Sequence, residues 1–124
     1  MNLLKQITPT LCLLYALALP LSAYDVPGFT PDETITYKET VDSSGGAVSL
    51  DLHLFKPDGH QASDSRPAIV FFFGGGWVSG SPSQFHPHCE YLASRGMVAI
   101  SAEYRVESQH GTTPQECVKD GKSA

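Results

Sequence analysis

The sequence predicts an α/β fold in which an antiparallel hairpin leads into a mostly parallel sheet. Residues 47–55 alternate, which is typical of a half-buried antiparallel strand. One face carries Val48, Leu50, Leu52 and Leu54, and the other carries Ser49, Asp51 and His53. Residues 68–73 and 97–102 are instead apolar at nearly every position, as in parallel strands that helices cover on both faces. Between them lies a segment with helical spacing, so the order is strand, helix, strand.

The first strand and the first helix follow from local signals. Residues 35–41 alternate, and the turn residues 42–46 join them to the next strand as a hairpin. A helix is expected within residues 84–95, with Pro87 in its first turn and Gly96 as a left-handed cap after its end.

A second helix is expected to begin after Thr113, with Pro114 in the first turn. Glu116, three residues after Thr113, completes the pattern of a capping box, and the helix is expected to continue to Ala124. No strand follows it, so we expect the parallel sheet to be incomplete within this sequence.

Residues 1–23 are predicted to be a secretory signal peptide, and residues 24–124 the folded domain. Lys5 precedes the uninterrupted apolar run 11–19, and Ala23 offers a small residue for cleavage. The run is shorter than the ~20 residues that a membrane-spanning helix needs, which makes a retained anchor the weaker alternative. We therefore expect a secreted or periplasmic protein that has no membrane anchor after cleavage.

The charge of the chain restricts which binding partners are expected. The chain has 124 residues and a formal net charge of −5, with no basic stripe to meet phosphates, which argues against nucleic acid. The length allows one modest domain.

Three consecutive glycines, Gly74, Gly75 and Gly76, follow the strand at residues 68–73. Because glycine has no side chain, the backbone N–H groups are accessible, and another group can approach the main chain closely. Acyl transfer needs such donors, facing the oxygen that becomes negative in the transition state. A dinucleotide-binding fingerprint would need glycine at Ser79, which excludes that alternative. A P-loop ending in residues 121–123 would likewise need glycine at Glu116. A glycine-rich turn without a chemical role is the remaining alternative.

The two motifs together resemble the α/β-hydrolase fold, in particular the carboxylesterase branch related to hormone-sensitive lipase. Residues 73–77 (Phe-Gly-Gly-Gly-Trp) are similar to that family's His-Gly-Gly-Gly-Trp. Residues 103–110 are similar to its Asp-Tyr-Arg-Leu-Ala-Pro-Glu-His stretch, and the segment with Pro114 and Asp120 to its next helix. The resemblance covers residues 36–124.

The resemblance implies roles for the glycine loop. Gly75 and Gly76 would donate their N–H groups to the oxyanion, Gly74 would serve the tight turn beside the substrate, and Trp77 would either line the acyl pocket or brace the loop. No metal and no cofactor are implied. Phe73 replaces the family's His, so apolar packing is expected to position the glycines in place of an imidazole hydrogen bond.

The implied function is a secreted serine hydrolase that cleaves carboxylic esters through an acyl-enzyme. Its substrate would be a small-molecule or polysaccharide ester, with acetylated xylan as one example. No Gly-x-Ser-x-Gly is present, so the catalytic serine, acid and histidine are expected beyond Ala124. The alternatives are a non-catalytic secreted binding protein with this fold and a peptidase or lactonase of the same fold.

Other residues have structural alternatives. His86, His88 and Cys89 could form part of a metal site, but a helix start explains them better because no second cluster is spaced to join them. Tyr104 and Arg105 either contact substrate or tie the loop to the sheet. Asp120 is expected to be solvated or to pair with its surroundings.

The expected fold argues against a disulfide between the two cysteines of the domain and against one histidine as the catalytic base. Right-handed crossovers would place Cys89 and Cys117 on helices at opposite faces of the sheet, too far apart for a disulfide. His110 precedes any possible nucleophile, contrary to the order serine, acid, histidine, so it is not expected to be the catalytic base.

Overall fold

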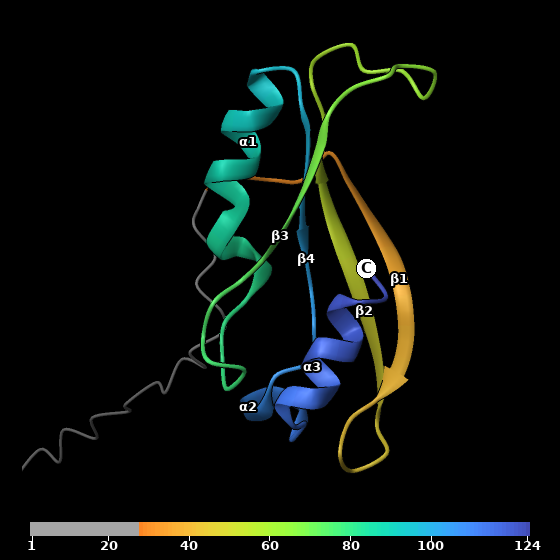
Figure 1. Ribbon diagram of the computed structural model, residues 1–124, viewed down its shortest axis with the longest axis vertical. Coiled ribbons are helices and arrows are strands. Elements are labelled where there is room, and N and C mark those ends of the chain that lie inside the picture. Colours follow the sequence, from red (N-terminus) through yellow and green to blue (C-terminus); the bar gives the residue numbers. More distant parts are fainter. Residues whose placement is uncertain (1–27) are drawn as a thin grey trace, which may run out of the picture.

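The computed structural model describes residues 28–124, so the signal peptide expected at residues 1–23 lies outside the described residues. Four strands form one sheet in the order β1-β2-β4-β3 (Figure 1). They are β1 (Glu33–Val41), β2 (Ala47–Phe55), β3 (Ala68–Phe72) and β4 (Val98–Ala102). β2 pairs antiparallel with both β1 and β4, whereas β3 pairs parallel with β4. The predicted hairpin leading into a parallel pair is confirmed.

Within residues 28–124, four helical segments connect or follow the strands. They are the 3-10 helix η1 (Pro82–Phe85), α1 (His86–Ser94), α2 (Glu107–His110) and α3 (Pro114–Gly121). The first predicted helix is confirmed: a proline lies in the first turn of α1, and Gly96 has a φ of +94° just after its end. The short helix α2 was not predicted, because four residues are too few to show a helical period.

The predicted second helix is α3, but two details of the prediction are wrong. α3 ends at Gly121 rather than at Ala124. Thr113 is the N-cap residue, yet its hydroxyl bonds the carboxylate of Glu116 and makes no cap bond to the backbone. The reciprocal side-chain-to-backbone bonds of a capping box are therefore absent here.

The helices α1 and α3 lie on opposite faces of the sheet. The Phe71 ring stacks on Phe85, immediately before α1, with ring centroids 4.8 Å apart. The neighbouring Phe72 ring lies beside Gly121 at the end of α3. Successive side chains of a strand point to opposite faces, so the two helices are separated by the sheet. As predicted, Cys89 on α1 and Cys117 on α3 are free thiols, each in its own apolar cluster.

The sheet departs from prediction at β3. Both faces of this strand were expected to be buried, but Val70 and Phe72 are 40% and 42% exposed. β3 is an edge strand of the sheet in residues 28–124, and α3 covers only part of the face that carries Val70 and Phe72. The continuous apolar sequence predicted full cover on both faces of β3, but among the described residues α3 covers one of these faces only in part. None of the helices among these residues is both long and apolar enough to cross a membrane.

Candidate active site

The glycine run forms a loop between the end of β3 and η1. Because β3 and β4 are parallel, their carboxyl ends point to the same end of the sheet, and α2 lies there too (Figure 1). Gly75 and Gly76 have φ angles of +153° and +62°. Trp77, with a φ of +64°, is the one non-glycine residue within 28–124 that adopts a positive value. Such strain costs roughly 1–2 kcal/mol and is concentrated at functional sites.

The peptide unit between Phe73 and Gly74 is held at both of its polar ends. The Tyr104 hydroxyl donates to the Phe73 carbonyl oxygen at 2.5 Å. The Gly74 N–H donates to Oε1 of Gln84 at 2.6 Å. The Gly74 N–H is therefore already occupied, which fits the role in the turn expected for Gly74 rather than a role as an oxyanion donor.

The far side of the loop is also tied down. The Gly75 carbonyl oxygen accepts from the N–H groups of Val78 and Ser79, at 3.1 and 3.3 Å. The Trp77 carbonyl oxygen accepts from the N–H of Glu107, the first residue of α2, at 3.0 Å. A Cβ added at Gly75 would lie 1.8 Å from the Ser79 carbonyl oxygen, so only glycine fits there.

Two N–H groups of the loop are left over. Within residues 28–124, no acceptor is paired with the N–H of Gly75 or of Gly76. The two belong to consecutive residues, and the space beside Gly76 is open, with no atom within 4 Å of a Cβ added there. Paired unoccupied donors on a fixed loop are what stabilisation of a developing oxyanion requires.

Phe73 packs as the sequence led us to expect. Its side chain is only 5% exposed and stacks on Tyr104, with ring centroids 4.1 Å apart and planes inclined by 16°. Gly80 closes the loop against the same ring, since a Cβ at Gly80 would lie 2.5 Å from Phe73. Burial raises the pKa of the Tyr104 hydroxyl, a direction that favours its protonated, donating form.

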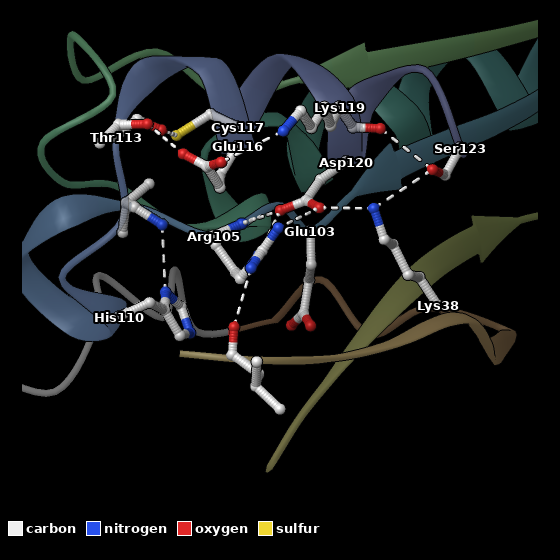
Figure 2. A network of polar contacts seen from close by, with 12 residues as sticks. Lys38, Glu103, Arg105, His110, Thr113, Glu116, Cys117, Lys119, Asp120 and Ser123 are labelled. Carbon is white, nitrogen blue, oxygen red and sulfur yellow. Dashed lines mark hydrogen bonds and ion pairs between the residues drawn. The ribbon is translucent and has the colours of Figure 1, made fainter. Parts of the chain in front are cut away.

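Arg105 and Asp120 tie this region to α3 and β1. Asp120 is fully buried, and its carboxylate accepts from Nε and Nη2 of Arg105 at 2.8 and 2.9 Å, and from Lys38 at 2.8 Å (Figure 2). Burial alone would raise the pKa of Asp120, but the bonds from Arg105 and Lys38 outweigh it and hold the pKa below its usual range. Of the two expectations for Asp120, the solvated one is wrong. Arg105 is structural, tying the loop to the sheet.

Sequence reasoning missed a cluster of His53, His86 and Glu103. Nδ1 of His53 lies 3.0 Å from Nε2 of His86, and Nε2 of His53 lies 3.4 Å from Oε1 of Glu103. All three line a cavity of about 240 Å³ that also borders Phe73 and Tyr104. His53 and His86 are 33 residues apart, so no local pattern could have joined them.

The remaining sequence candidates are placed as follows. His110 accepts the N–H of Val106 through Nδ1, at 3.0 Å (Figure 2). Cys89 is buried in the core, and no three His, Cys, Asp or Glu side chains within 28–124 gather as a metal site. Trp77 is 49% exposed and lines a mostly apolar cavity of about 230 Å³ between β3 and α3, together with Phe72 and Val118.

Comparison with solved structures finds close likeness to esterases. The apo form of esterase 2 from the planctomycete Thermogutta terrifontis is 49% identical to this chain, with a TM-score of 0.69. The match covers 78% of this chain and 34% of that one. The propionate-bound form of the same esterase matches over the same shares with a TM-score of 0.68. The chain thus spans about a third of the length of the solved esterases it matches.

Curated relatives match over shorter stretches. Probable carboxylesterase 8 of Arabidopsis thaliana is 32% identical over 62 residues, which are 48% of this chain and 19% of the relative. Neuroligin-like protein glit-1 of Caenorhabditis elegans is 43% identical over 58 residues, 46% of this chain and 8% of that protein. No known protein-family profile matches the chain. The sheet order and the structural likeness together show that this chain forms part of an α/β-hydrolase fold and is similar to esterases of that fold.

Proposed function

We propose that this chain supplies the oxyanion loop of a secreted serine hydrolase that cleaves carboxylic esters through an acyl-enzyme. One observation supports this most directly. The N–H groups of Gly75 and Gly76 have no acceptor within residues 28–124, although the carbonyls and the N–H around them are engaged. The esterase relatives supply the reaction class.

In the proposed reaction, the glycine loop stabilises the negative oxygen of the transition state. When a serine attacks the ester carbonyl, its oxygen becomes negative and accepts hydrogen bonds from both N–H groups. Loss of one such donor costs on the order of 10²–10³ in kcat in other hydrolases. The sequence contains no Gly-x-Ser-x-Gly, and His110 is engaged with Val106, so the nucleophile, acid and base of the proposed enzyme lie outside these 124 residues.

Short acyl groups suit the proposed site. Trp77 lines a small apolar cavity at the end of β3, and forms of the Thermogutta esterase are described as propionate-bound and butyrate-bound. Acetyl esters of polysaccharide are the substrate that we favour, because the N-terminal segment predicts export to where polysaccharides lie. Neither nucleic acid nor a membrane anchor is part of the proposal.

The test compares two polypeptides: the complete gene product that contains this sequence, and the 124-residue chain alone. We expect the complete product to hydrolyse p-nitrophenyl acetate and acetylated xylan, and to lose activity on stoichiometric labelling by an organophosphonate. The 124-residue chain should do neither, because no acyl-enzyme forms without the serine.

The alternatives give different results. A complete product that neither hydrolyses esters nor is labelled would be a binding protein with this fold. Labelling together with hydrolysis of only peptides or lactones would identify a peptidase or lactonase. Turnover by the 124-residue chain, abolished by mutating one of its own serines or histidines, would overturn the proposal.

A further inference from the structure

Gln84 makes a contact with the glycine loop that no sequence motif assigns. It lies in η1, ten residues after Gly74, and its side chain reaches back across the loop. Its amide oxygen Oε1 accepts the Gly74 N–H at 2.6 Å, although the residue itself is exposed. An exposed side chain contributes little to the core, so this bond needs another explanation.

The segment that carries Gln84 is firmly attached to the sheet. The hydroxyl of Ser101, a fully buried residue of β4, donates to the Pro82 carbonyl oxygen at 2.7 Å. Ser81 caps η1 by accepting the Ser83 N–H, and the two serine hydroxyls lie 2.5 Å apart. Gln84 therefore extends from a fixed support toward a loop made of glycines, which restrict their own backbone least.

The Phe73–Gly74 peptide is clamped from two sides. Tyr104 holds its carbonyl oxygen and Gln84 holds its N–H, and these two groups belong to one planar unit. Fixing the plane of that unit holds one end of the glycine loop, and the bonds from the Val78 and Ser79 N–H groups to the Gly75 carbonyl oxygen hold the other. Between these two constraints, the N–H groups of Gly75 and Gly76 have few directions left in which to leave the chain. The bond to Gln84 also removes Gly74 from the set of donors that could face a substrate.

We propose that Gln84 is a positioning residue of the oxyanion loop: by occupying the Gly74 N–H, it orients the N–H groups of Gly75 and Gly76 toward the substrate. The proposal rests on the proposed function. It explains why the loop holds its geometry where Phe73 has no imidazole to brace it.

Two substitutions in the complete gene product test this role. Gln84→Met keeps the length of the side chain and removes the acceptor, whereas Gln84→Glu retains a strong acceptor at the same place. Gln61→Met is the matched control, because Gln61 is also exposed and its amide bonds the carbonyl oxygen of Gly59 in another loop.

We expect Gln84→Met to lower kcat for p-nitrophenyl acetate by roughly 10- to 100-fold, since small displacements of catalytic groups have effects of that size. KM should stay within about twofold, because the bond acts on the transition state rather than on ground-state binding. Hydrogen exchange at the Gly74 amide should be slow in the wild type and in Gln84→Glu, and fast in Gln84→Met. Gln84→Glu should recover part of kcat, and Gln61→Met should match the wild type throughout.

The outcomes separate the two proposals. A kcat for Gln84→Met that is close to the wild-type value, or Gly74 exchange that this variant leaves unchanged, would overturn the role of Gln84 while leaving the esterase intact. A wild-type protein without ester hydrolysis would overturn the proposed function itself, whatever the exchange experiment shows.

Discussion

Phe73 shows how one replaced side chain is accommodated beside the glycine run. The family pattern has histidine at this position, whereas here a buried ring stacks on Tyr104 and the backbone carbonyl of the same residue receives the Tyr104 hydroxyl. One tyrosine thus makes both an apolar and a polar contact with Phe73. The loop is braced through packing and one hydrogen bond to the main chain.

Tyr104→Phe tests this bracing contact. The change leaves the buried Phe73 carbonyl oxygen without its donor, so we expect the free energy of unfolding to fall by about 1–2 kcal/mol in urea titration. Tyr91→Phe is the control, because the Tyr91 side chain is largely exposed, and it should unfold like the wild type. Equal stability of the two variants would mean that the Tyr104 hydroxyl bond contributes nothing.

Among the elements, α3 is joined to the rest of the fold by the ion pairs of Asp120 and by the apolar contacts of Cys117. The carboxylate meets Arg105 from the segment after β4 and Lys38 from β1, so one buried charge joins three parts of the chain (Figure 2). Arg105 also donates to the Val41 carbonyl oxygen at the end of β1. This arrangement holds α3, and the segment that leads into α2, against the sheet.

Asp120→Asn should destabilise the protein by about 3 kcal/mol at pH 7, because it leaves the buried Arg105 without its counter-charge. Glu116→Gln on the same helix is the control: its partners Thr113 and Lys119 are both exposed, and little effect is expected. The pKa of Asp120 is lowered in the folded state, so its contribution is present above about pH 4 and is lost as the pH falls through the folded value. The difference between Asp120→Asn and the wild type should therefore shrink in urea titrations below that pH. A difference that stays constant from pH 7 to pH 3 would contradict the assignment.

The sequence was informative where the signal is local. Alternation in residues 47–55, the apolar run before the glycines and Gly96 predicted β2, β3 and the end of α1 closely. Contacts between distant residues were not predictable. Asp120 and Lys38 are 82 residues apart, and only the folded sheet brings them together.

In the candidate site, too, local sequence named some residues, while others were found only in the folded structure. The glycine run and its resemblance to an esterase motif named Gly75 and Gly76 from sequence alone, and those roles stay predictions. The contact between Gln84 and the Gly74 N–H could not be predicted from sequence, because it forms only when η1 turns back toward the glycine loop. The His53, His86 and Glu103 cluster likewise needed the three-dimensional arrangement.

At the scale of the whole molecule, the described residues correspond to one part of a larger solved esterase. The chain covers about a third of the Thermogutta esterase, and the outer face of β3 exposes Val70 and Phe72. The glycine loop lies at the carboxyl end of this strand, where ligands bind in open α/β sheets. The fold thus places two N–H groups that have no acceptor within residues 28–124 at the carboxyl end of β3, and we propose that the ester chemistry takes place there.

The most direct measurement compares Gly76→Val with Gly59→Val in the complete gene product. Both glycines have similar φ angles, +62° and +69°, and neither has an atom within 4 Å of an added Cβ, so the backbone strain introduced is matched. Gly75 is less suitable, because a side chain there collides with Ser79. We predict similar decreases in Tm for the two variants, but a fall in kcat on the order of 100-fold for Gly76→Val alone. A kcat that falls equally in both variants, or only in proportion to the lost stability, would show that the glycine loop is structural and not an oxyanion hole.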